Sequence, residues 1–219
     1  MDDLDGEYTH EMCIEDIKNK RLTIDMLDII GSFSYNEVFE IFLAAVKNNG
    51  MSIEEVINMM ENYTKIVMDR NNKTSVEYII RKLDYVKICL EAVKNNGLAL
   101  QHLINLCPIG RGIFKMYYNI PNIEIEGKGS TGGKISSLEY IFFEAVKNNG
   151  MALKYVFNGY QNKRICFEAI KQDIRALKYV REDIFGSAMT LKSLAFKQLK
   201  KIDNIDKNKL IDILTPLFY

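Results

Sequence analysis

The chain has 219 residues, of which 47% are hydrophobic and 26% charged, with 29 acidic and 29 basic side chains and a formal net charge of zero. These values are typical of a globular protein and exclude both a small disulfide-stapled scaffold and a mainly disordered chain. No apolar run approaches the roughly 20 residues that a membrane-spanning helix needs, and the first residues are acidic where a secretory signal would be basic. We therefore expect an intracellular, cytoplasmic protein with no membrane partner.

A repeated segment begins almost at the N-terminus. CIEDIKNKRLTIDML at residues 13–27 has the apolar frame of FLAAVKNNGMSIEEV at 42–56, CLEAVKNNGLALQHL at 89–103, FFEAVKNNGMALKYV at 142–156 and CFEAIKQDIRALKYV at 166–180. The last two copies start 24 residues apart (166 − 142), while the other spacings are near twice that value. The repeat period is therefore close to 24 residues, and the longer gaps hold degenerate or interrupted units.

Each copy predicts a helix, an Asn-Asn-Gly turn and a second helix. The apolar residues before the turn recur at spacings of three and four, as on one face of an α-helix. Gly50, Gly97 and Gly150 are predicted as structural turn residues, because glycine adopts the left-handed conformation of a helix C-cap at low cost. Where Ile174 replaces this glycine, we expect a weaker cap and a different turn.

Capping signals mark the helix starts. Ser34 and Ser136 are each followed three residues later by glutamate, which predicts a capping box at the start of a first helix. Ser52 with Glu55 predicts the same for a second helix.

A helix pair this short cannot bury its apolar face alone, so successive pairs should stack on one another. The predicted fold is all-α, an α-solenoid-like array of short helix-turn-helix repeats. It forms a single domain over residues 1–219, with atypical terminal units at 1–33 and 190–219. A glycine-rich loop or β-hairpin interrupts it at about 106–135.

The repeat resembles a tandem helical repeat family of unknown function found in bacterial and protist proteins, whose units read roughly L-x-A-V-x-x-N-G-x-A-L-x-Y. The resemblance extends from Cys13 to Val180 with interruptions and is most specific in the three AVKNNG copies. It implies a helical repeat fold, and it brings no catalytic motif to carry over.

Three of the four cysteines share one repeat position. Cys13, Cys89 and Cys166 stand where other copies have Phe42 and Phe142, which predicts core residues. The fourth, at position 107, stands alone before a proline, and no CxxC spacing occurs. We therefore expect neither a metal site nor a disulfide framework.

The interruption at 106–135 is a candidate partner-binding loop, since long inserted loops on repeat proteins often carry contacts. Its candidate binding residues are Arg111, Lys115, Tyr117, Tyr118, Lys128 and Lys134. Alternatively, part of it forms the apolar face of a degraded repeat helix. The segment from Gly127 to Lys134 looks like a phosphate-binding loop, but its glycine spacing does not match one, so no nucleotide cofactor is expected.

The zero net charge conceals a division along the chain. Residues 1–62 hold 14 acidic and 4 basic side chains, which leaves 15 acidic and 25 basic in residues 63–219. Charge of this kind indicates either an interface for nucleic acid or an acidic protein, or simply a solvated face. The candidate basic surface consists of Lys163, Arg164, Lys171, Arg175, Lys178 and Arg181.

No arrangement of residues indicates catalysis, because His10 and His102 are the only histidines and neither has a nucleophile or paired carboxylate beside it in the pattern. The sequence predicts a non-catalytic protein–protein interaction module, with no cofactor and no catalytic residue. The alternative is a protein that binds RNA or a nucleoprotein complex through its basic C-terminal half, as an inhibitor of a host nucleic-acid machine made by a mobile element or pathogen.

Overall fold

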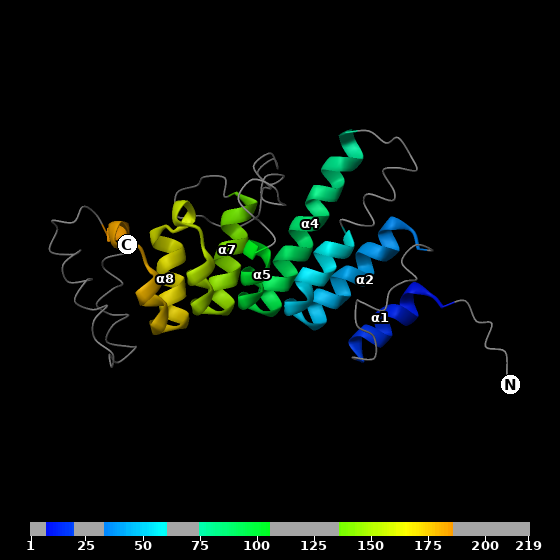
Figure 1. The fold of residues 1–219 in the computed structure, drawn as a ribbon, viewed down its shortest axis with the longest axis horizontal. Helices are drawn as coiled ribbons and strands as arrows, with labels where there is room; N and C mark the ends of the chain where they lie inside the picture. The colour runs from blue at the N-terminus through cyan, green and yellow to red at the C-terminus, as the bar shows by residue number, and fades with distance from the viewer. Residues whose placement is uncertain (1–7, 20–32, 61–74, 106–135, 186–219) are drawn as a thin grey trace. The chain divides into compact units, whose positions relative to one another are not determined.

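The computed structural model describes residues 8–19, 33–60, 75–105 and 136–185. Within these ranges the chain consists of helices and the turns between them, with no strand, so the predicted all-α class is confirmed (Figure 1). The chain divides into two compact units, an N-terminal unit of Met1–Asn95 and a C-terminal unit of Asn96–Tyr219.

In the N-terminal unit, successive helices pack against one another. They are α1 (His10–Lys18), α2 (Tyr35–Asn48), the 3-10 helix η3 (Gly50–Ser52), a helix at residues 53–60, and α4 (Ser75–Asn95). α1 packs on α2, and α2 packs on α4 (Figure 1). The buried face of α2 carries the predicted spacing of three and four, with Val38, Ile41, Phe42, Ala45 and Val46.

In the C-terminal unit, short 3-10 helices alternate with α-helices. The elements are η4 (Gly97–Ala99), α5 (Leu100–Asn105), α7 (Ser137–Asn148), η5 (Gly150–Tyr155), η6 (Asn158–Tyr160), α8 (Lys163–Gln172), η7 (Ile174–Tyr179) and η8 (Glu182–Phe185). α7 packs on α8, and η5 packs on both α8 and η7. Figure 1 shows α7 and α8 side by side.

The repeat position shared by cysteine and phenylalanine lies in the core, as predicted. Cys13, Cys89 and Cys166 are free thiols with at most 2% exposure, and the equivalent Phe42 and Phe142 are equally buried. Burial raises the pKa of the Cys13 thiol. These cysteines therefore act as small apolar side chains between packed helices.

The helix starts follow their capping signals only in part. Ser34 and Glu37 form the predicted capping box, with the Ser34 N–H donating to the Glu37 carboxylate at 2.7 Å and the Glu37 N–H donating to Ser34 Oγ at 3.5 Å. Ser136 Oγ likewise accepts from the Glu139 N–H at 3.2 Å. Ser52, however, lies inside η3 and is not a cap.

The second element of each copy is shorter than the predicted helix. It continues as α-helix at residues 53–60 and in α5, but η5 and η7 are 3-10 helices of six residues each. In the last two copies the chain must return within one 24-residue period. A 3-10 helix rises about 2.0 Å per residue against 1.5 Å for an α-helix, so it covers the distance in fewer residues.

An asparagine or aspartate in each turn caps the 3-10 helix that follows. Asn149 has extended backbone, with φ −143° and ψ 109°, and its side chain accepts from the Met151 N–H at 3.0 Å. Asp173 has φ −143° and ψ 115° and accepts from the Arg175 N–H at 2.9 Å. The two turns have the same geometry, so the expectation that Ile174 changes the turn is wrong.

The turn glycines are explained by close approach and not by backbone conformation. Neither Gly97 nor Gly150 has a left-handed φ, so the predicted C-cap role is wrong. A Cβ on Gly150 would instead overlap the carbonyl oxygen of Ala169 and lie 2.9 Å from the Asp173 backbone nitrogen. The next helix therefore ends directly against this residue, and only glycine leaves room for it.

A side-chain amide at the end of each helix contacts the preceding turn. These amide positions are Asn48, Asn95, Asn148 and Gln172. In the N-terminal unit, Asn95 Oδ1 accepts from the Gly50 N–H at 2.8 Å, while its Nδ2 donates to the Lys47 carbonyl at 2.7 Å. One side chain thus satisfies a donor and an acceptor that the preceding helix end leaves open.

The same contact recurs in the C-terminal unit. Asn148 Oδ1 accepts from the Gly97 N–H at 2.7 Å. Gln172 Oε1 accepts from the Gly150 N–H at 2.6 Å, and its Nε2 donates to the Asn148 carbonyl at 3.2 Å. The first Asn of the Asn-Asn-Gly turn therefore joins one copy to the copy before it.

Candidate interaction surface

The candidate residues of the inserted segment fall outside the described residues. Arg111, Lys115, Tyr117, Tyr118, Lys128 and Lys134 all lie between 106 and 135, as do Cys107 and the proposed loop or hairpin. Their role in partner binding stays a prediction.

The six candidate basic residues all lie on the last helices of the described C-terminal unit. Lys163, Arg164 and Lys171 belong to α8, Arg175 and Lys178 to η7, and Arg181 follows η7 directly. Half of them have an acidic partner.

Arg175 and Arg181 each pair with an aspartate two residues away. The Arg175 guanidinium donates to both Asp173 oxygens, with Nη2 to Oδ2 at 2.7 Å, and this pairing raises the pKa of Arg175. Arg181 donates to both Asp183 oxygens and to the Asn158 carbonyl, and its hydrogen bond lowers the pKa of Asp183. These two arginines therefore present less uncompensated positive charge than the sequence suggested.

Lys171 is the third paired cation. Its Nζ lies 3.9 Å from the Glu168 carboxylate one helical turn away, and more than half of its side chain is exposed. An exposed pair of this length contributes little energy.

The remaining cations lie beside aromatic rings or in solvent. The Arg164 guanidinium lies 4.1 Å from the centroid of the Phe143 ring, and the Lys178 amine lies 5.0 Å from that of Tyr179. Lys163 is exposed. Arginine and lysine over aromatic faces gain about 0.5–1 kcal/mol at exposed sites.

The lysine–tyrosine pair occurs twice at equivalent repeat positions. Lys154, 24 residues before Lys178, lies 5.4 Å from the centroid of the Tyr155 ring. Phe157 beside it is 38% exposed, one of the few large apolar side chains on the described surface, and packs edge-on to Phe142. We call the Lys–Tyr pairs together with Phe157 and Arg164 the aromatic–basic face, as these side-chain types are enriched in protein interfaces.

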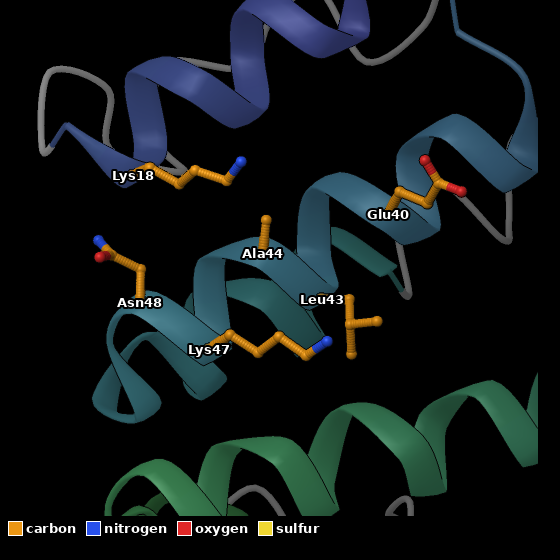
Figure 2. A pocket seen from close by; sticks show the side chains of 6 residues that line it. All are labelled: Lys18, Glu40, Leu43, Ala44, Lys47 and Asn48. Carbon is orange, nitrogen blue, oxygen red and sulfur yellow. The ribbon is translucent and has the colours of Figure 1, made fainter.

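The sequence did not single out a hollow in the N-terminal unit. This α1/α2 groove has a volume of about 380 Å³ and is lined by Lys18, Glu40, Leu43, Ala44, Lys47 and Asn48. Figure 2 shows Lys18 extending from α1 toward α2, with Ala44 and Leu43 on α2 and Glu40 one end away. The signal that could have revealed it is the alanine of FLAAVKNNG, where the other copies have an acidic residue at the equivalent place in the pattern.

Two further searches covered the described residues alone. Within them, no group of three or more histidine, cysteine or acidic side chains could hold a metal ion. Nor is any described helix long and apolar enough to cross a membrane.

A family model for a domain of unknown function (DUF4116) matches residues 139–185. The matched segment contains the two copies at 142–156 and 166–180, and its description assigns no activity. No curated protein and no solved structure matches the chain. The resemblance over residues 13–180 remains a prediction outside the matched segment.

Proposed function

We propose that the chain is a non-catalytic interaction module, an α-solenoid-like array of helical repeats that binds another protein. The observation that carries the proposal is the use of the shared repeat residues. The first Asn of each turn bonds to the preceding turn, the second residue caps the 3-10 helix, and the glycine makes room for the next helix end. The sequence that all copies share is therefore consumed in building the array.

The side chains that differ between copies are the ones left for a partner. Tyr155 and Tyr179 correspond to Glu55 and His102 in the earlier copies, and Lys154 and Lys178 correspond to Glu54 and Gln101. A scaffold with constant internal contacts and variable outer side chains is how repeat proteins form binding surfaces. The aromatic–basic face is the best candidate in the C-terminal unit.

Binding of RNA or a nucleoprotein is the second candidate, and the repeated lysine–tyrosine pairs support it, because bases stack on aromatic rings and phosphates attract lysine. The ion pairs of Arg175 and Arg181 count against it, since both guanidiniums already have carboxylate partners. A protein partner with mixed charge fits this face better than a polyanion does.

The test separates the two candidates with one set of variants. Single-stranded RNA and DNA are titrated against the full chain from low to physiological salt, with Lys171, Arg175, Lys178 and Arg181 all changed to glutamate in a second sample. As a protein-binding module, the chain should bind neither nucleic acid saturably near 150 mM salt. A strong affinity that falls steeply with salt and disappears in the variant would establish nucleic-acid binding instead.

The protein-binding arm uses the exposed aromatic–basic face. A photo-crosslinking residue placed at Phe157 should capture a discrete partner, and Arg164→Ala should weaken that capture by about tenfold, as interface arginines often do. Lys47→Ala, in the other compact unit, is the matched control and should leave it unchanged. Failure to capture any protein at this face would contradict the proposed site.

A further inference from the structure

The α1/α2 groove marks the one described copy that departs from the repeat at a charged position. Three residues before the lysine of each first helix lies a carboxylate position, occupied in turn by Glu15, Ala44, Glu91, Glu144 and Glu168. Each of the four glutamates pairs with its lysine, at distances from 3.1 Å in α4 to 3.9 Å in α8. In α2, by contrast, Lys47 has no acidic partner among the described residues.

The same alanine opens the hollow. Ala44 and Leu43 are half-buried and form the apolar part of the groove, and Lys47 and Asn48 lie on its α2 side. Lys18 reaches toward it from α1 (Figure 2). A glutamate in place of Ala44 would occupy this space and pair with Lys47, as Glu144 does with Lys147 at 3.7 Å.

Positive charge in this part of the chain is concentrated at the groove. Residues 1–62 hold 14 acidic and only 4 basic side chains, and two of the four are Lys18 and Lys47. The Lys18 pair with Glu15 is long, at 3.7 Å, and both side chains are more than 60% exposed, so it holds Lys18 weakly. Glu40, at the other end, has His10 Nε2 at 3.7 Å.

We propose that the α1/α2 groove binds a short segment of a partner protein, with one Asp or Glu carboxylate of that segment beside Lys47 and an apolar side chain against Leu43 and Ala44. The partner's carboxylate takes the place of the glutamate that the repeat omits here. The volume of about 380 Å³ is near the lower end for ligand sites, which suits two or three residues of a peptide. The inference rests on the proposed function, because it names a second contact for a protein-binding module.

The surrounding charge selects against a polyanion. With ten more acidic than basic side chains in residues 1–62 (14 − 4), the phosphates of a nucleic acid would be repelled around the groove. A single carboxylate within a neutral or basic segment avoids this repulsion, and basic neighbours would be attracted to Glu40. The occupant is therefore a peptide with one acidic residue, an adjacent apolar residue and basic flanks.

The experiment uses the full chain and a defined probe, the capped peptide acetyl-Lys-Leu-Glu-Leu-Lys-amide, followed by NMR chemical-shift titration. The expected result is saturable binding with shifts at the groove residues and at least about fivefold weaker binding of the matched peptide with Gln in place of Glu. Ala44→Glu should weaken binding by about tenfold or more, since it fills the hollow and neutralises Lys47. Lys47→Gln should weaken it by a few-fold.

Lys147→Gln, at the equivalent lysine of α7, is the matched control and should leave the dissociation constant unchanged. Ala44→Glu is expected to fold, because four copies carry glutamate there, and circular dichroism checks this. Lys47→Gln still decides the outcome should that variant unfold. Equal binding of the two peptides, no binding of either, or shifts at the groove with single-stranded RNA would each overturn the inference. If the groove fails while crosslinking at Phe157 still captures a protein, the proposed function stands without it.

Discussion

The turns at Gly150 and Ile174 have the same backbone, the same cap and the same following 3-10 helix, yet one needs glycine and the other carries a β-branched residue. The difference lies in what comes next. The end of α8 approaches Gly150 closely, and Gln172 bonds to its N–H. No side-chain amide of the described chain reaches the Ile174 N–H.

This contrast teaches that the glycine is a contact residue between copies and not a requirement of the turn itself. A turn without a following copy in the same register tolerates a large side chain. Ile174 therefore marks where the described series of joined copies ends, a role that its local sequence would not suggest.

The largest effect is expected from Gly150→Ala. The added Cβ would overlap the Ala169 carbonyl oxygen, which belongs to helix backbone and cannot move aside cheaply. We expect a loss of about 3 kcal/mol or more in the free energy of unfolding, measured by urea denaturation. Ile174→Gly, the matched change at the other turn, should cost only about 1 kcal/mol through chain flexibility. Equal losses at the two turns would show that the turn, and not the neighbour, selects glycine.

An intermediate effect is expected from Asn148→Ala. The substitution leaves the buried Gly97 N–H without the acceptor that lies 2.7 Å away. Leaving a buried donor unpaired costs about 1–3 kcal/mol, which thermal unfolding would detect. Asn148→Asp is a useful comparison, since it keeps an acceptor oxygen but removes the amide donor. If Asn148→Ala were as stable as the natural chain, the amide contact would not join the copies.

The smallest effect is expected where the two turns are alike. Asn149→Ala and Asp173→Ala each remove a side chain that accepts from the N–H two residues later, at 3.0 and 2.9 Å. Each should lower stability by about 1 kcal/mol, as loss of a cap does. The comparison of the two melting temperatures is the informative measurement. A clear difference between them would contradict the equivalence of the two caps.

Much of the fold could be predicted because its signals are local. Apolar residues at spacings of three and four defined the first helices, and Ser34 with Glu37 defined a helix start. Periodicity also placed Cys13, Cys89 and Cys166 in the core, since equivalent positions in a repeat share an environment.

The candidate site could be predicted less well, because ion pairing depends on side-chain geometry. The sequence counted Arg175 and Arg181 as free positive charge, while the structure shows each bound to an aspartate two residues away. The α1/α2 groove was missed because a single alanine among five copies reads as ordinary variation. Its significance appears only when the unpaired Lys47 and the hollow are seen together.

The sequence by itself determined the helical class, the repeat period and the residues of the core, because these follow from the local spacing of apolar and capping residues. Only the tertiary structure decided why the turn reads Asn-Asn-Gly. Its first asparagine bonds to a backbone group at least 45 residues earlier in the α4 and α7 copies, and its glycine yields space to the helix end of the following copy. Contacts between segments this distant leave no local periodicity, so the same three letters suggested an ordinary helix cap.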